Sequence, residues 1–313
     1  MAIRQDIATQ VVDLPHAVLA AKQPGALAAL RNYVALTKPR IIGLLLVTTV
    51  PAMILAEQGW PSLWLILLTL LGGTLSAGGA NTINCYLDRD IDGIMERTKK
   101  RPIPAGLIEP ERALVFGMFL GIAGFSVLAI SVNMPAALLA TGALLFYVFV
   151  YTIWLKRDSS QNIVIGGAAG ALPPVIGWAA VTGSLDWPAL VLFGIIFLWT
   201  PPHFWALAQR YKDDYASASV PMLPVVSSES ETNRQILIYS VVLVAATFVL
   251  VPVAGMGLLY AAAALVLGAG FIYYAVRLWR MPGDKASMAL FFYSLPYLAL
   301  LFMLAGADQF ARF

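Results

Sequence analysis

The fold is decided by residues 63–92, which read LWLILLTLLGGTLSAGGANTINCYLDRDID. Most of this stretch is apolar, and a helix needs about 20 mostly apolar residues to cross the hydrocarbon core of a membrane. Three carboxylates, Asp88, Asp90 and Asp92, follow directly where the apolar run ends. The stretch therefore predicts a membrane-spanning helix that carries a polar, functional site at one end.

The composition of the whole chain is that of an integral membrane protein. Of its 313 residues, 60% are apolar and 12% are charged, whereas a soluble globular chain carries about 25% charged residues. A water-soluble enzyme is therefore excluded. Cys85 is the only cysteine, so the chain can form neither an intramolecular disulfide nor a CxxC metal site. Nine stretches qualify as membrane spans, at 41–56, 62–84, 113–132, 135–155, 162–181, 188–208, 236–253, 257–276 and 286–305.

The positive charges fix the orientation of these spans. Lys and Arg residues near the ends of spans favour the cytoplasmic side. With nine spans and the N-terminus inside, 19 of the 20 Lys and Arg residues fall in inside segments, and only Arg312 falls outside. The sequence therefore predicts an all-α bundle of nine transmembrane helices with a cytoplasmic N-terminus and a C-terminus outside.

The two ends of the chain are predicted to lie apart from the bundle. Residues 1–38 lack the apolar core and small-residue cleavage site of a signal peptide, and their stretch 26–34 is weakly amphipathic. We expect a partly disordered or interfacial cytoplasmic tail at 1–38, a membrane domain at 39–308 and a short tail at 309–313. Asp6 and Asp13 argue against a transit peptide, which favours the inner membrane of a bacterium, with the active site toward the cytoplasm.

The end of the second span predicts a magnesium site. Asn84, Asp88 and Asp92 are spaced i, i+4 and i+8, so a continuing helix would stack them on one face at intervals of about 6 Å. Like charges one turn apart repel, and ionisable groups at a membrane boundary are costly and usually functional. A divalent metal resolves both costs, since magnesium takes one or two carboxylates and completes its shell with water and phosphate oxygens.

Basic residues accompany the carboxylates in three inside segments. Cations beside a carboxylate-bound metal are typical of a site that binds a polyanion, because Arg and Lys match phosphate groups. If the three segments surround one opening above apolar helices, the site would bind a molecule with a charged head group and an apolar chain, such as a polyprenyl diphosphate. The residues concerned are Arg97, Lys100, Arg101, Lys156, Arg157, Arg210 and Lys212, with Asp213 and Asp214 beside the last pair.

The sequence resembles the UbiA superfamily of intramembrane prenyltransferases, whose first motif NxxxDxxxD is present as Asn84, Asp88 and Asp92. Within the superfamily the chain is most similar to the branch that farnesylates protohaem IX. The stretches that carry the likeness occur in the same order and are LTKPR (36–40), NTINCYLDRD (81–90), RTKKRP (97–102), YTIWLKR (151–157), GGAAGALPP (166–174), WTPPHFW (199–205), DY (214–215) and VPMLP (220–224).

This resemblance implies a reaction in which farnesyl diphosphate and protohaem IX give haem O and diphosphate. It implies magnesium as the cofactor, with haem B as a substrate rather than a cofactor. The expected partners are farnesyl diphosphate, haem B and membrane lipid, with haem A synthase or oxidase assembly factors as further partners and no nucleic acid.

The resemblance also assigns roles to individual residues. Asn84, Asp88, Asp92, Asp213 and Asp214 are expected to be catalytic, with Asp88, Asp92 and Asp214 as metal ligands. One departure concerns the second motif, which is often DxxxD in the superfamily but has Gln209 and Arg210 where its first carboxylate would stand. The number of metal ions therefore stays open. Substrate contacts are expected from Arg97, Lys100, Arg101, Tyr151, Lys156, Arg157, His203, Arg210 and Lys212.

Aromatic and histidine side chains complete the candidate site. Aromatic faces would shield an allylic cation by cation–π attraction, and the candidates are Tyr86, Tyr151, Phe204 and Trp205. His203 is the only histidine within the predicted spans. It has two equally weighted interpretations: a contact to haem or to the hydration step, or a structural role beside the Pro201-Pro202 pair.

Two other functions compete with haem farnesylation. The first is a related prenyltransferase acting on 4-hydroxybenzoate, a quinone precursor or chlorophyllide. The second is an ion- or proton-coupled secondary transporter that uses Asp88 and Asp92. Transporters usually place such groups at the bilayer midplane on broken helices, whereas these lie at a span end beside a basic loop, which favours phosphate chemistry.

Overall fold

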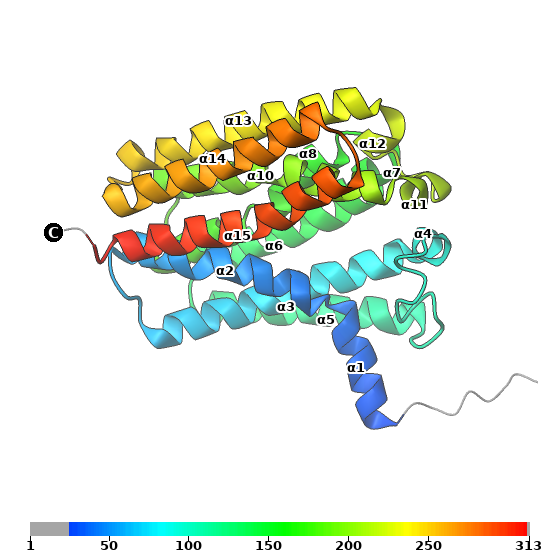
Figure 1. The fold of residues 1–313 in the computed structure, drawn as a ribbon. Coiled ribbons are helices and arrows are strands. Elements are labelled where there is room, and N and C mark those ends of the chain that lie inside the picture. Colours follow the sequence, from blue (N-terminus) through cyan, green and yellow to red (C-terminus); the bar gives the residue numbers. More distant parts are fainter. Residues whose placement is uncertain (1–24, 312–313) are drawn as a thin grey trace, which may run out of the picture.

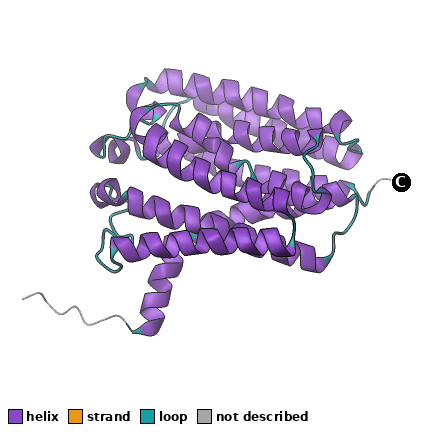
Figure 2. Ribbon diagram, turned by 180° about the vertical axis from the view of Figure 1, so that it is seen from behind, coloured by secondary structure: helices purple, strands orange, loops and turns teal. Residues whose placement is uncertain are grey.

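Residues 25–311 are described by a computed structural model, and expectations for residues 1–24 and 312–313 lie outside this range. Within the described residues, nine helical segments are long and apolar enough to span a membrane. They are α2 (Pro39–Glu57), α3 (Leu63–Leu87), α5 (Pro110–Ser131), α6 to α7 (Met134–Asp158), α8 and α9 (Asn162–Thr182), α10 (Trp187–Arg210), α13 (Glu229–Val253), α14 (Leu258–Arg280) and α15 (Asp284–Asp308). The predicted all-helical, nine-span architecture is confirmed, and the described residues contain no strand (Figure 2).

Short helices fill the connections between the spans. They are α1 (Ala26–Leu36), α4 (Arg89–Ile94), α11 (Lys212–Ser217) and α12 (Leu223–Val226). Figure 1 shows α4, α7, α11 and α12 at one end of the bundle, with the C-terminus at the other end and α1 lying crosswise to the spans. The basic connections therefore gather at one end, as the charge pattern predicts.

The helix of the seventh span is longer than the predicted apolar stretch. Helix α13 begins at Glu229, seven residues before the predicted span 236–253. The hydroxyl of Ser228 accepts a hydrogen bond from the Glu231 backbone N–H at 3.2 Å, and acidic side chains in a first turn complement the helix dipole. The polar turn is therefore helical, although it is too polar to lie in the hydrocarbon.

The helices α3 and α5 approach each other through glycine. A Cβ atom on Gly79 would lie 2.7 Å from the Gly117 carbonyl oxygen, and one on Gly124 would lie 2.7 Å from the Ser76 backbone nitrogen. Small residues at such crossings let two membrane helices pack backbone against backbone. This packing fixes the helix that ends at the carboxylates.

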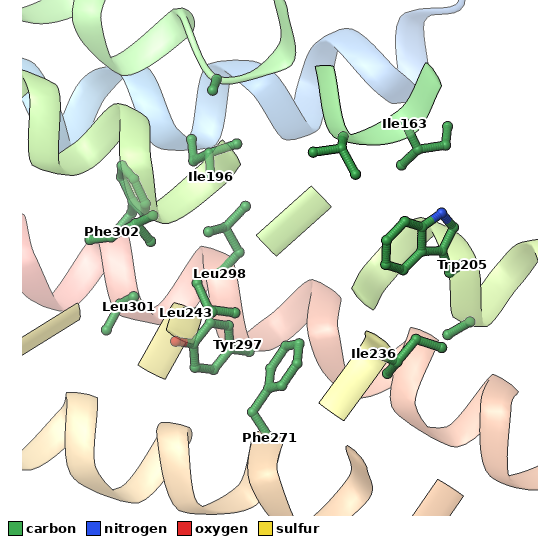
Figure 3. Close-up of a cluster of buried hydrophobic side chains, with 14 of the residues drawn as sticks. Ile163, Ile196, Trp205, Ile236, Leu243, Phe271, Tyr297, Leu298, Leu301 and Phe302 are labelled. Atoms are coloured by element: carbon green, nitrogen blue, oxygen red, sulfur yellow. The ribbon is translucent and has the colours of Figure 1, made fainter. Parts of the chain in front are cut away.

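A large hydrophobic core joins α10, α13, α14 and α15 with residues of α2, α8 and α9 (Figure 3). Trp205 of α10 and Phe271 of α14 are buried, with exposed fractions of 1% and 0%. Phe271 meets the ring of Tyr297 at a centroid distance of 4.7 Å in an edge-to-face arrangement, which is a favourable geometry for aromatic rings. Trp205 therefore packs in this core, and its expected role as a cation shield stays a prediction.

The fourth span changes its winding before it reaches the basic end. Helix α6 (Met134–Leu145) continues as a π-helix, η1 (Phe146–Leu155), and ends as α7 (Lys156–Asp158). The Thr152 hydroxyl donates to the Tyr147 carbonyl, five residues earlier, at 2.8 Å. Stretches of π-helix are rare and frequent at functional sites, and this one carries Tyr147, Tyr151 and Thr152 toward the end of α3.

Candidate active site

The first carboxylates lie where α3 passes into α4. Asp88 separates the two helices, yet its backbone N–H donates to the Asn84 carbonyl at 2.9 Å, and the Asp92 N–H donates to the Asp88 carbonyl at 2.8 Å. The helical phase therefore continues through the junction. Asn84, Asp88 and Asp92 are 2%, 0% and 1% exposed, so all three polar side chains point into the protein.

Two cations from other segments neutralise these carboxylates. Lys156 of α7 donates a hydrogen bond to Asp88 Oδ2, and Arg101 Nη1 lies 2.9 and 2.7 Å from the two oxygens of Asp92. A buried carboxylate is costly to leave unpaired, so these contacts compensate for its desolvation. The structure brings together the predicted residues of two inside segments that are separated by more than fifty positions.

Arg157 forms a second, more exposed layer. Its guanidinium binds both oxygens of Asp90, at 2.7 and 2.8 Å, and donates to the Leu87 carbonyl at 3.0 Å. Its Nη2 also lies 3.9 Å from Asp88 Oδ1. Asp90 is 58% exposed, and it therefore points away from the buried group and holds Arg157 against it.

Asn84 is held by two residues that the sequence reasoning missed. Its Nδ2 donates to Asp88 Oδ2 at 2.7 Å and to the Thr152 hydroxyl at 3.1 Å, while its Oδ1 accepts from Lys38 Nζ at 2.7 Å. Both missed residues lie in stretches that resemble the family, LTKPR and YTIWLKR. That position was the only available signal, because the contacts join segments far apart in sequence.

The second motif contacts the loop that follows the first motif. Asp214 of α11 accepts hydrogen bonds from the backbone N–H groups of Glu96, at 2.7 Å, and of Arg97, at 3.3 Å. The Arg97 side chain donates in return to the Tyr215 hydroxyl at 3.1 Å. Asp214 therefore joins the two long polar loops.

Four predicted residues lie at the surface of this end. Asp213, Lys212 and Lys100 are exposed, and Arg210 binds Asp284 of α15 at 3.1 Å. Asp213 and Arg210 line an open cleft of about 730 Å³ that also includes Arg97, Tyr211 and Asp214. Within residues 25–311, no hydrogen bond or ion pair joins these residues to Asp88 or Asp92, so their part in catalysis stays a prediction.

The residues present fit a magnesium ion at the first motif. Asp88 Oδ1 is buried and accepts no hydrogen bond in the described part of the chain, so one hard oxygen ligand faces the site without a donor. No three Asp, Glu, His or Cys side chains within residues 25–311 gather into a metal-binding group. A pair of carboxylates suits magnesium, which completes its shell with water and phosphate oxygens. Asp88 and Asp92 would hold it.

An apolar cavity opens next to these groups. It has a volume of about 190 Å³ and is lined mainly by aliphatic side chains of α2, α3, α6, α8 and α9, with Asn81 and Tyr147 among its polar atoms. Asn81 lies one helical turn from Asn84, so the cavity extends from the polar group into the bundle. Its lining suits an aliphatic chain.

The aromatic residues divide between this cavity and the packing around it. Tyr147 lines the cavity and stacks on Tyr151 at a centroid distance of 5.2 Å. A Cβ atom on Gly166 would clash with the Tyr151 ring, so this glycine makes room for that tyrosine. The guanidinium carbon of Arg89 lies 4.3 Å from the centroid of the Tyr86 ring, in a cation–π contact. Tyr147 is thus a further site residue that the sequence reasoning missed.

His203 is enclosed by other side chains of the bundle. Its ring stacks with Trp199, at a centroid distance of 4.0 Å, and with Phe291, at 4.8 Å. Its Nδ1 lies 2.6 Å from the Ser294 hydroxyl oxygen. These contacts within the bundle favour the structural interpretation of His203 over a contact to haem.

Charges around the site shift several pKa values. Hydrogen bonds from Arg157 lower the pKa of Asp90 from 3.8 to about 2. Burial lowers the pKa of the Lys38 ammonium, because the charged form loses its hydration. Burial also opposes the charge of Arg101, but the attraction and hydrogen bonds of Asp92, together with weaker contributions from neighbouring groups, outweigh it and raise the pKa of Arg101. The ion pairs thus keep Asp90 and Arg101 charged.

Comparison with known proteins agrees with this geometry. The sequence model of the UbiA prenyltransferase family matches residues 45–296. The chain is 55% identical over 299 residues to protoheme IX farnesyltransferase 1 of Saccharopolyspora erythraea, with 94% of each chain covered. It is 56% identical over 287 residues to protoheme IX farnesyltransferase of Gloeobacter violaceus, covering 91% of this chain and 94% of that relative.

Solved structures share the fold at lower identity. A structure of digeranylgeranylglyceryl phosphate synthase superposes with a TM-score of 0.75 at 18% identity, covering 91% of this chain and 100% of that chain. A UbiA homolog from Archaeoglobus fulgidus bound to GPP and Mg2+ superposes with a TM-score of 0.65 at 16% identity, covering 90% and 100%. The family model covers most of the chain and the relatives are more than half identical over most of its length, and the chain therefore belongs to the UbiA prenyltransferase family.

Proposed function

We propose that this chain transfers a farnesyl group from farnesyl diphosphate to a vinyl group of protohaem IX, with uptake of one water molecule, giving haem O and diphosphate. The observation that carries the proposal is the buried pair Asp88 and Asp92, neutralised by Lys156 and Arg101 beside an apolar cavity. The acceptor is inferred from the relatives, which are named protoheme IX farnesyltransferases at 55% and 56% identity.

The two parts of farnesyl diphosphate match two parts of the site. The apolar chain would enter the cavity that Tyr147 and Asn81 border, and the diphosphate would remain with the buried polar group. Burial of the chain supplies binding free energy of about 25 cal/mol for each Å² of apolar surface removed from water. The reacting carbon would lie between the two parts.

Ionisation of the allylic C–O bond is the step that the charged residues favour. Magnesium bound by Asp88 and Asp92 would supply positive charge to the leaving diphosphate. Lys156 and Arg101 present fixed cations where negative charge develops, which lowers the barrier because they are already oriented. Arg157, held by Asp90, adds charge from the exposed side.

The allylic cation must be protected from water until the acceptor attacks. The stacked rings of Tyr147 and Tyr151 can stabilise a cation near their faces, and the apolar cavity walls exclude solvent. Attack by the vinyl group forms the new C–C bond and moves the positive charge to the acceptor. Water then captures that cation and releases a proton, which gives the hydroxyethylfarnesyl group.

The wider setting of the enzyme follows from the same proposal. We infer a bacterial inner membrane location, with the basic end of the bundle and its active site in contact with the cytoplasm. Haem A synthase or oxidase assembly factors are proposed partners that would take haem O onward. The charge distribution along the chain supports this orientation.

The test uses the purified full-length protein in detergent with labelled farnesyl diphosphate. Haem and 4-hydroxybenzoate are offered separately, each with Mg2+ and with excess EDTA. We expect labelled haem O only with haem and Mg2+, with release of one diphosphate for each product. Product with 4-hydroxybenzoate alone would replace haem as the acceptor, and the absence of any diphosphate release would reject prenyl transfer altogether.

A further inference from the structure

Lys38 adopts a strained backbone conformation, which indicates that its side chain has a role that glycine could not fill. It lies between α1 and α2 with φ 56° and ψ 60°, in the left-handed region. That region strains every residue with a Cβ atom, whereas glycine adopts it freely. Strained residues of this kind persist where the surroundings hold them, and they cluster at functional sites. The ammonium group is the feature that glycine would lack.

Two consecutive residues, Thr37 and Lys38, are hydrogen-bonded to α3. Asn81 Nδ2 donates to the Thr37 carbonyl at 2.9 Å, and Lys38 Nζ donates to Asn84 Oδ1 at 2.7 Å. A Cβ atom on Gly78 would lie 3.4 Å from the Thr37 side chain. Three successive positions on one side of α3 therefore direct the Lys38 side chain to the end of the helix where the carboxylates lie.

Basic groups outnumber carboxylates at this place. Arg101 pairs with Asp92, Lys156 pairs with Asp88, and Arg157 pairs with Asp90. Lys38 has no carboxylate partner of its own, and burial opposes its charged form, which an anion would stabilise. An uncompensated charge at a membrane boundary is costly. Asn84 also accepts only one of the three N–H groups of the Lys38 ammonium, and no other hydrogen bond from Nζ occurs in the described residues. An anionic ligand with several acceptor oxygens would complete both the charge and the hydrogen bonds.

We propose that Lys38 binds the diphosphate of the prenyl donor directly, through the N–H groups that Asn84 leaves free. This inference rests on the proposed function. A lysine ammonium is a compact point charge that suits phosphate oxygens from one side, while Arg101 and Lys156 approach the same group from other segments. The LTKPR stretch thereby supplies a third cation to the site, from the segment that precedes the first span.

Binding of inorganic diphosphate tests the proposal without a catalytic readout. Calorimetric titration in the presence of Mg2+ compares the full-length wild type in detergent with Lys38→Met and Lys38→Gly. The methionine variant keeps the apolar stem and the strained backbone, whereas the glycine variant relieves the strain. We expect both to raise the Kd at least tenfold, with the exposed Lys285→Met within twofold of wild type. Thermal unfolding shows that the variants fold.

The outcomes separate this inference from the proposed function. If the wild type does not bind diphosphate with Mg2+, both are rejected. If it binds and the two folded Lys38 variants bind equally well, only the role of Lys38 is rejected. A double variant distinguishes direct contact from an effect through Asn84: Lys38→Met should weaken binding further in an Asn84→Ala background. No further loss in that background would overturn direct contact.

Discussion

Asp214 holds the backbone of Glu96, a residue 118 positions earlier in the chain, through a hydrogen bond of 2.7 Å. Its other oxygen accepts from the Arg97 N–H at 3.3 Å. A carboxylate that accepts two backbone N–H groups fixes the path of the loop that donates them. The loop after α3 is therefore ordered by the segment after α10.

The first prediction concerns this contact between the loops. Asp214→Ala leaves the Glu96 and Arg97 N–H groups without their acceptor, so hydrogen–deuterium exchange at these two amides should accelerate at least tenfold. Farnesyl transfer should fall with it, because Arg101 follows on the same loop. The adjacent, exposed Asp213 provides the control for exchange: Asp213→Ala should leave the two amides protected. Equal exchange in both variants would contradict the role of Asp214.

The second prediction concerns the buried carboxylate of the first motif. Asp88→Asn removes the charge that Lys156 neutralises and one proposed magnesium ligand. Removal of one preorganised electrostatic group typically lowers kcat by about 10²–10³-fold, and we expect a loss of at least this size in single-turnover farnesyl transfer. Asp158→Asn changes an exposed carboxylate at the same end and should retain activity. A variant of Asp88 that is as active as this control would exclude Asp88 from the mechanism.

The third prediction concerns acid stability. Because Arg157 lowers the pKa of Asp90 from 3.8 to about 2, the pair stabilises the folded state fully above pH 3.8. This contribution is lost as the pH falls toward 2, since the unfolded state binds the proton first. In detergent, Asp90→Asn should show a smaller drop in the thermal midpoint between pH 5 and pH 3 than the wild type. Parallel curves for the two proteins would show that the ion pair adds no stability.

The fourth prediction concerns the close approach of α3 and α5. Gly79→Ala places a Cβ atom 2.7 Å from the Gly117 carbonyl, and backbone atoms cannot move aside as a side chain can. Overpacking typically costs about 1–3 kcal/mol, so the thermal midpoint should fall by several degrees. Gly142→Ala is the matched control, because nothing lies within 4 Å of its new methyl group. A midpoint for Gly79→Ala equal to that of the control would show that the helices can separate freely.

The sequence predicts the membrane helices well, because length and apolarity alone decide them. The predicted second span, 62–84, corresponds to α3 at Leu63–Leu87. Helix α13 extends beyond the predicted seventh span, since a hydropathy criterion ends where polar residues begin, whereas Ser228 and the helix dipole extend the helix into the polar region. Local hydrogen bonds decide helix ends, and hydropathy does not report them.

The candidate site was predictable in part. The i, i+4 spacing indicates that Asn84 and Asp88 share a face, and the structure shows a direct hydrogen bond between them at 2.7 Å. Spacing carries no information about partners from other helices. The contacts of Lys38 and Thr152 with Asn84 depend on how α2 and η1 pack against α3, and a single sequence does not contain that information in a readable form.

The π-helical winding of η1 makes the length of the fourth span a constraint. Each residue added to or removed from an α-helix turns everything beyond it by about 100°. Lys156 follows η1 directly and reaches Asp88, so deletion of one residue between 146 and 155 would rotate the ammonium out of reach of its carboxylate. The same deletion in the turn around Gly283, where φ is 136°, would be absorbed locally. Tolerance of insertions and deletions should therefore be lower in this membrane-embedded segment than in the connecting turn.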